Sequence, residues 1–258
     1  MQAETATQWG ECEIRGPVHL FRERLILRLF RRAVASGRVL DAGCGSGSMA
    51  FDLCGFGYEV DAVEDSHEFV DFVRTQADRR GLSDRLRVRQ GSVAELDFED
   101  AQFDGLVCGE VLEHVTPEDG GDSAAVGEFH RVVKPGAPCV VSVPFNPDLW
   151  DNSDVWARHV KRYTKPGLVA LFEGAGFDVE RTKVWGFPLG RLYHRLLFAP
   201  WLKRTAGASI GDRETRVDTR VGRSPLLVQL VSRALQFDEL FSGFQWGRGI
   251  VLVARRRG

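Results

Sequence analysis

Apolar residues recur every three or four positions near the start of the chain, and arginines fill most positions between them. The apolar set is Leu20, Phe21, Leu25, Leu29, Phe30, Ala33 and Val34. This spacing places them on one side of a helix, so it predicts an amphipathic helix. Gly37 follows, where a glycine commonly ends a helix. We therefore expect a helical amino-terminal segment over residues 1–36.

The next hundred residues alternate between short apolar runs and helical periodicity. The runs at 38–42, 58–64, 86–92, 103–110 and 138–144 predict strands. The segments at 46–54, 67–81 and 123–136 predict helices. Strands that alternate with helices in this way form βαβ units and a parallel sheet. Ligands of such sheets bind at the carboxyl ends of the strands.

The pattern changes after Pro144. A long connection with two tryptophans (145–164) precedes a helix (165–177) and a strand (177–187). An apolar and basic helix over 190–204 is expected to be interrupted by Pro200, and a polar segment (205–224) reads as a mobile loop. Another helix (225–241) and a final strand (248–257) follow. We expect a core over 37–187, completed by the strand within 248–258, and a helical cap over 188–247.

Charge is unevenly distributed. Residues 181–258 hold 15 Lys and Arg against 5 Asp and Glu, whereas residues 1–180 carry a net charge of −12. The basic region suggests contact with an anionic ligand or a membrane surface, against the alternative of a solvated helix face. Five scattered cysteines and the absence of a signal-like start favour a reducing, cytoplasmic location. No nucleic-acid motif is present, so nucleic acid is not an expected partner.

A glycine-rich loop follows the first strand. Gly43, Gly45 and Gly47 allow a tight turn before a helix whose amino end faces a ligand. A dinucleotide-binding loop would have a third glycine or an alanine where Ser48 stands. Asp41 lies beside the loop and would repel a pyrophosphate, whereas it would attract a cationic ligand such as an amine or a sulfonium.

The segment "VLDAGCGSG" resembles the first motif of the class I S-adenosylmethionine-dependent methyltransferases, in particular their small-molecule branch (type 11/23-like). The resemblance implies a Rossmann-like, seven-stranded, mostly parallel sheet with helices on both faces. It also implies S-adenosyl-L-methionine as cofactor and S-adenosyl-L-homocysteine as product. Asp41 and the three glycines would form the cradle, while Glu64, with Asp65 adjacent, would bind the ribose hydroxyls.

The resemblance continues to about residue 187. Ser92 stands where the family commonly has aspartate, and it would meet the adenine together with the backbone of Val93. The segment "GEVLEHV" resembles the family's fourth-strand motif and places Glu110 near the cofactor. The segment beginning "HVKRYT" resembles the entry to a helix in the small-molecule branch.

Methyl transfer is an in-line displacement, so positioning supplies much of its rate, and an oxygen or nitrogen acceptor also needs a base. His159 is our first candidate, His114 the second, and Tyr163 lies in the same connection as His159. His19 could close over the cofactor, whereas His130 and His194 are expected to be structural.

A metal-assisted reaction is an alternative at Glu110, Glu113 and His114, which would share one face of a helix. An ordinary helix start explains the same spacing, so no metal is expected.

The expected function is methyl transfer to a small, rather hydrophobic metabolite on oxygen, nitrogen or carbon. The sequence leaves open the atom that is methylated and the oligomeric state. Two alternatives remain: a nicotinamide-dependent oxidoreductase on a similar sheet, and a protein that binds the cofactor without transferring methyl.

Overall fold

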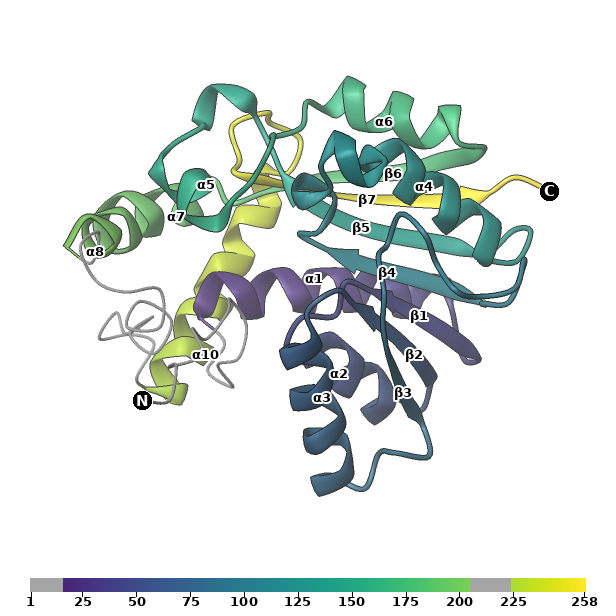
Figure 1. Ribbon diagram of the computed structural model, residues 1–258. Helices are drawn as coiled ribbons and strands as arrows, with labels where there is room; N and C mark the ends of the chain where they lie inside the picture. The colour runs from purple at the N-terminus through teal and green to yellow at the C-terminus, as the bar shows by residue number, and fades with distance from the viewer. Residues whose placement is uncertain (1–15, 205–223) are drawn as a thin grey trace.

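The computed structural model describes residues 16–204 and 224–258. Its centre is a seven-stranded sheet in the order β3-β2-β1-β4-β5-β7-β6 (Figure 1). The strands are β1 (Arg38–Ala42), β2 (Glu59–Glu64), β3 (Leu86–Gln90), β4 (Gly105–Gly109), β5 (Pro138–Pro144), β6 (Phe177–Trp185) and β7 (Gly249–Arg256). β1 to β5 run parallel, and β7 is antiparallel to both β5 and β6. The predicted Rossmann-like sheet is confirmed.

Helices cover both faces of this sheet, and each face has its own apolar core. One face packs against α1 (Pro17–Ala33), α2 (Ser48–Gly55) and α3 (His67–Arg79). The other packs against α4 (Gly121–Val132) and α6 (Lys165–Gly174). β5 is buried along its whole length, which explains why its sequence is a continuous apolar run.

The connection after β5 contains a 3₁₀ turn, η3 (Pro147–Leu149), and a short helix, α5 (Asn152–Ala157). Asp151 begins α5 as a capping box: its side chain accepts the Ser153 N–H, and Asp154 accepts the Asp151 N–H. The long connection predicted from the sequence therefore contains ordered helical turns.

The predicted interruption at Pro200 is wrong. α7 (Leu189–Tyr193), a π-helical turn η4 (His194–Phe198) and α8 (Ala199–Arg204) form one continuous helix. The π turn sends the Ala199 N–H to the His194 carbonyl. Because Pro200 follows this wide turn directly, its missing N–H removes one bond without ending the helix.

The segment between β6 and β7 continues with α10 (Pro225–Ala234) and the 3₁₀ helix η5 (Leu235–Phe241). We call its described residues, 188–204 and 224–247, the cap. The polar segment predicted as a mobile loop lies, but for Ser224, outside the described residues. Arg28 of α1 pairs with Glu239 of η5 at 2.6 Å, and α10 lies beside α1 (Figure 1). Within the described ranges no helix is both long and apolar enough to cross a membrane.

Candidate functional site

The glycine loop lies over the carboxyl end of β2. The N–H groups of Gly43 and Cys44 both donate to the Val63 carbonyl, at 2.9 and 3.0 Å. Gly43, Gly45 and Gly47 have φ values of +77°, +51° and +76°, a region that disfavours other residues. A Cβ on Gly43 would lie 2.4 Å from Val111, whereas a Cβ on Gly45 would enter open space. The loop therefore leaves room above Gly45.

Asp41 is completely buried on β1, one residue before the end of that strand. Among the described residues neither carboxylate oxygen has a hydrogen-bond partner. Burial, together with the nearby Glu23 and Glu64, raises the pKa of Asp41 to about 8. A buried carboxylate without a partner is unfavourable, so this position is suited to a cationic ligand.

Glu64 ends β2 and points back to the loop. Its carboxylate accepts the Gly45 N–H at 2.8 Å and the Ser66 N–H at 3.2 Å. Burial and the neighbouring Asp65 raise the pKa of Glu64 to about 7. Asp65 itself is exposed, so Glu64 is the acid that lies against the loop.

The predicted adenine turn lies after β3. Ser92 is exposed, its hydroxyl accepts the Ala94 N–H at 3.1 Å, and Val93 is buried. These contacts leave the predicted adenine roles of Ser92 and Val93 as proposals.

The sequence analysis missed Glu23, a third acid near the loop. Glu23 lies on α1, is 3% exposed, and accepts a hydrogen bond from the Ser48 hydroxyl. His19 Nε2 lies 2.9 Å from its Oε1. Its position, three after Leu20 and four before Leu27, put an acid on an otherwise apolar helix face. An acid within the apolar pattern was the sequence signal that could have identified Glu23.

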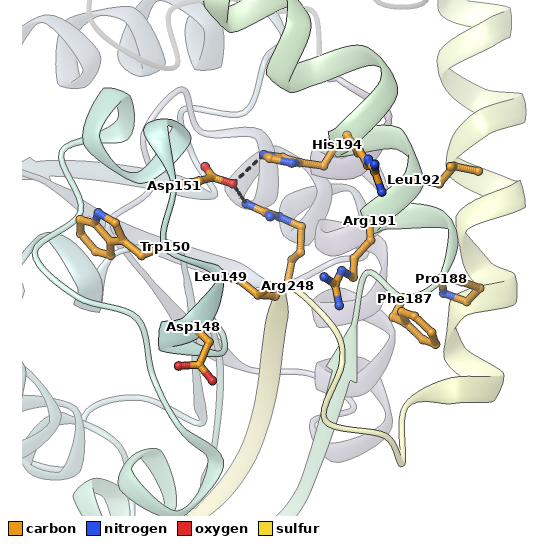
Figure 2. Close-up of a pocket in the computed structure, with 11 residues that line it drawn as sticks. Asp148, Leu149, Trp150, Asp151, Phe187, Pro188, Arg191, Leu192, His194 and Arg248 are labelled. Carbon is orange, nitrogen blue, oxygen red and sulfur yellow. Dashed lines mark hydrogen bonds and ion pairs between the residues drawn. The ribbon is translucent and has the colours of Figure 1, made fainter.

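A pocket of about 530 Å³ opens between the turn after β5 and the cap (Figure 2). Its apolar wall includes Leu149, Trp150 and Phe187, and its polar wall includes Asp148 and several basic residues. The basic residues are Arg191, His194, Arg195 and Arg248. The predicted basic region thus contributes its charge to a pocket.

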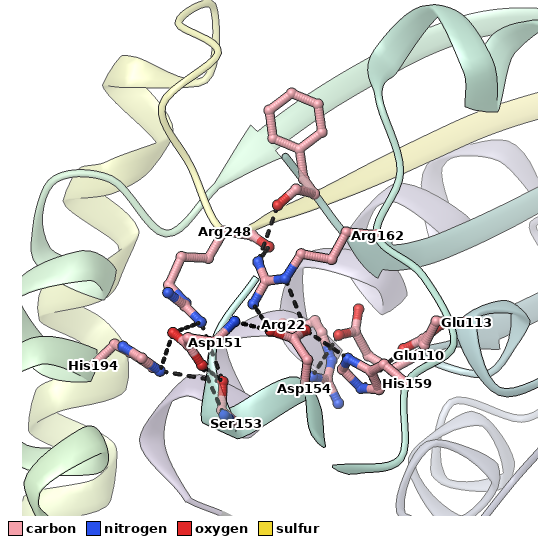
Figure 3. A network of polar contacts seen from close by, with 11 residues as sticks. Arg22, Glu110, Glu113, Asp151, Ser153, Asp154, His159, Arg162, His194 and Arg248 are labelled. Carbon is pink, nitrogen blue, oxygen red and sulfur yellow. Dashed lines mark hydrogen bonds and ion pairs between the residues drawn. The ribbon is translucent and has the colours of Figure 1, made fainter. Parts of the chain in front are cut away.

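Asp151, His194 and Arg248 of this pocket belong to a network of partly buried polar groups (Figure 3). Asp151 Oδ2 lies 3.1 Å from Arg248 and 3.5 Å from His194. Three residues later, Asp154 binds Arg162 through two contacts of 2.7 and 2.9 Å. Asp154 Oδ1 also lies 2.9 Å from His159 Nδ1. Burial would raise the pKa of Asp154, but hydrogen bonds from His159 and Arg162 hold it well below its usual range.

His159 turns its other nitrogen towards Glu113. Nε2 lies 3.8 Å from Glu113 Oε1, and the rings of His159 and His114 are 5.0 Å apart. Glu113 is completely buried, and burial together with Glu110 raises its pKa well above the usual range. Burial and His159 lower the pKa of His114 to about 4, although the residue as a whole is exposed. The first two catalytic candidates, His159 and His114, are therefore neighbours.

The backbone turns at Glu110, so its side chain makes contacts other than those of Glu113 and His114. Its φ of +59° turns the chain, and its carboxylate accepts the Ser142 hydroxyl at 2.7 Å. Arg22 of α1 lies 3.5 Å from its other oxygen. The expectation that Glu110, Glu113 and His114 share one α-helical face is wrong, because only Leu112–His114 is helical and that turn is 3₁₀ (η1).

The other candidates lie apart from His159. The Tyr163 hydroxyl donates to Asp122 of α4 at 2.9 Å, and its ring is buried in the core. His130 packs against Phe177 with 5.4 Å between ring centroids. His194 belongs to the pocket, where burial and Arg248 lower its pKa to about 4.

Comparison with known proteins gives a consistent result. Residues 40–141 match the family model described as a methyltransferase domain. A sterol 24-C-methyltransferase of Gibberella zeae is 30% identical over 173 residues, which cover 64% of this chain and 44% of that protein. A ubiquinone biosynthesis O-methyltransferase of Xanthomonas axonopodis pv. citri is 28% identical over 218 residues, 78% of this chain and 84% of that protein.

Among solved structures, a geranyl diphosphate C-methyltransferase from Streptomyces coelicolor superposes with a TM-score of 0.61 at 16% identity. The superposition covers 92% of this chain and 76% of that chain. That protein was crystallised with Mg²⁺, geranyl-S-thiolodiphosphate and S-adenosyl-L-homocysteine. At this level of identity the likeness shows a shared fold, and the sequence matches carry the assignment of family.

Proposed function

Since the chain belongs to the class I S-adenosylmethionine-dependent methyltransferases, we propose that it methylates a hydroxyl oxygen of a small, largely apolar acceptor. The observation that carries the choice of oxygen is the Asp154–His159 pair, which holds one imidazole nitrogen towards Glu113. A hydroxyl acceptor must lose its proton during methyl transfer, and an oriented histidine is suited to take it.

S-adenosyl-L-methionine is the methyl donor of this family, and S-adenosyl-L-homocysteine is the product. When bound, the donor supplies a methyl group on a positively charged sulfur. We assign its cradle to Asp41, Gly43, Gly45, Gly47 and Glu64. Two observations support a fit: Asp41 is buried with no described partner, and the space above Gly45 is open. The proposal also keeps four further residues as cofactor contacts: Asp65, Ser92, Val93 and Glu110.

The proton of the acceptor would leave through His159. Asp154 is ionised, so it accepts the Nδ1–H of His159 and leaves the lone pair of Nε2 free to take a proton. The bound donor would supply the methyl group to the acceptor oxygen and its sulfur would keep the electron pair of the broken carbon–sulfur bond, while Nε2 of His159 would take the hydroxyl proton. The contacts of Tyr163 with Asp122 favour a structural role for that residue.

The cap pocket supports an acceptor with an apolar body and an anionic group. Trp150 and Phe187 offer apolar surface, and Arg191 and Arg195 offer positive charge. We therefore favour a small anionic ligand over a membrane surface as the partner of the basic region. The proposal keeps a core over 37–187 and a cap over 188–247. A reducing, cytoplasmic setting is also part of it, because the four described cysteines are free.

The test is a panel assay that detects S-adenosyl-L-homocysteine by mass spectrometry. Phenolic acids, primary amines and apolar alkenes would be incubated with the protein and S-adenosyl-L-methionine. We expect product with hydroxyl acceptors, and its loss in His159→Gln with donor binding unchanged. His67→Gln, which alters an exposed histidine of α3, is the matched control.

Each other outcome has a definite meaning. Turnover of amines or alkenes alone would contradict the assignment to oxygen. Donor binding without turnover across the panel would support the alternative of a non-catalytic binding protein. Binding of NAD in place of S-adenosyl-L-methionine would overturn the assignment of the cradle.

A further inference from the structure

Three potential metal ligands converge beside the carboxyl ends of β4 and β5. Each of Glu113, His114 and His159 offers one donor atom, and these three atoms lie within 4.8 Å of one another. Glu113 and His114 belong to η1, and His159 comes from the connection after α5. The Val160 N–H donates to the Glu113 carbonyl at 2.8 Å, so a backbone bond fixes the two segments side by side.

The buried carboxylate of Glu113 is the strongest sign that a cation belongs here. It is 0% exposed, and neither oxygen accepts a hydrogen bond from the described part of the chain. His159 Nε2 lies 3.8 Å from its Oε1. Burying an acid without a partner is unfavourable, and a bound cation would supply the missing partner.

The support around His159 is that of a metal-binding histidine. Such histidines commonly donate their second N–H to a carboxylate, which fixes the tautomer and directs the free lone pair at the ion. His159 donates through Nδ1 to Asp154, and two contacts from Arg162 hold Asp154 in place. Nε2 therefore has the lone pair that can bind a metal ion, and it is the nitrogen that faces Glu113 (Figure 3).

We propose that Glu113, His114 and His159 bind one divalent transition-metal ion of the zinc or iron(II) type. Two imidazoles and one carboxylate favour such ions over Mg²⁺, which prefers oxygen ligands. Metal–ligand distances of about 2.1 Å imply ligand atoms roughly 3.4 Å apart in a tetrahedral site. The Glu113–His159 separation of 3.8 Å needs a small contraction, and the pairs that include His114, which lie within 4.8 Å, need a larger one. Three protein ligands leave a position open.

Ion binding itself does not depend on methyl transfer, but the use of the open position by the acceptor rests on the proposed function. With the ion bound, Nε2 of His159 is a ligand, so the proton transfer to Nε2 proposed above belongs to the ion-free protein. A hydroxyl at the open position would then lose its proton more easily because the ion stabilises the oxyanion.

The test is a titration of the purified, chelator-stripped full chain with Co²⁺, followed by its visible d–d absorption. We expect one ion per chain for the wild type. Glu113→Gln should weaken binding by roughly 10- to 100-fold, since a neutral amide replaces the anionic ligand. This near-isosteric change removes a buried ionisable group, so it should not destabilise the fold. His159→Gln should have a similar effect, and His67→Gln should have none.

The proposal is overturned if no stoichiometric absorption develops at millimolar Co²⁺. It is also overturned if Glu113→Gln binds as tightly as the wild type while its melting temperature is unchanged. Donor binding, measured separately, distinguishes the two proposals. A protein that binds S-adenosyl-L-methionine but not Co²⁺ lacks only the ion site, whereas one that binds Co²⁺ without methyl transfer refutes only the proposed function.

Discussion

His159 Nδ1 and Asp154 Oδ1 lie 2.9 Å apart, at the end of a chain of polar contacts that begins in the cap pocket. Arg162 holds the same aspartate from its other side. This arrangement fixes both the tautomer and the direction of the imidazole. A change at Asp154 should therefore affect methyl transfer without affecting the binding of the methyl donor.

Asp154→Asn should lower kcat for methyl transfer by roughly 10- to 100-fold and leave the affinity for S-adenosyl-L-methionine unchanged. The amide has an N–H where the carboxylate has an acceptor oxygen, so it can favour the wrong tautomer of His159. Steady-state kinetics with calorimetric donor titration would measure both quantities. Asp178→Asn, on the surface, is the control, and an equal loss of donor affinity would contradict the assigned role.

Glu64→Ala should weaken the binding of S-adenosyl-L-methionine by roughly 10- to 100-fold, because two charge-assisted hydrogen bonds to the ribose would be lost. Glu68→Ala changes an exposed acid four residues away and should leave affinity unchanged. Isothermal titration of both variants provides the comparison. Unchanged affinity in Glu64→Ala would refute the ribose assignment.

Asp41→Asn should stabilise the ligand-free protein above about pH 8 and should abolish donor binding. The pKa of about 8 lies above the value of about 3.9 expected for the unfolded chain, so the folded state binds more protons between these limits. The free energy of unfolding therefore falls as pH rises from about 4 to 8. In Asp41→Asn this carboxyl group is absent, so the free energy of unfolding should not fall for this reason. Urea denaturation at pH 6 and pH 9, with Asp84→Asn as control, should show the difference, and a parallel shift at both pH values would count against it.

Substituting two glycines of the same loop should have different effects. Gly45→Ala places a methyl group in open space, so we expect a backbone cost of about 1–2 kcal/mol and a large loss of donor affinity. Gly43→Ala forces a Cβ against Val111 at 2.4 Å and should mainly lower the melting temperature. Thermal denaturation and donor titration of both variants test this. Normal donor binding in Gly45→Ala would show that the open space is not the ligand site.

The order of strands and helices, and the placement of Glu64 against the glycine loop, could be predicted from the sequence because both depend on local spacing. Asp41, Gly43, Gly45 and Glu64 all lie within two strands and one turn. The group of Glu113, His114 and His159 could not be predicted in the same way. His159 is 46 residues from Glu113, and only the folded connection after α5 brings them together. Glu23 approaches the cradle from a separate helix for the same reason.

β7 has a consequence for how the chain is synthesised. The ribosome releases the cradle, β5 and β6 well before residues 249–256, yet β7 pairs with both β5 and β6. Until β7 arrives, the apolar run of Val140, Val141 and Val143 has one unpaired strand edge. We therefore expect the nascent chain to expose this strand edge until β7 pairs with it.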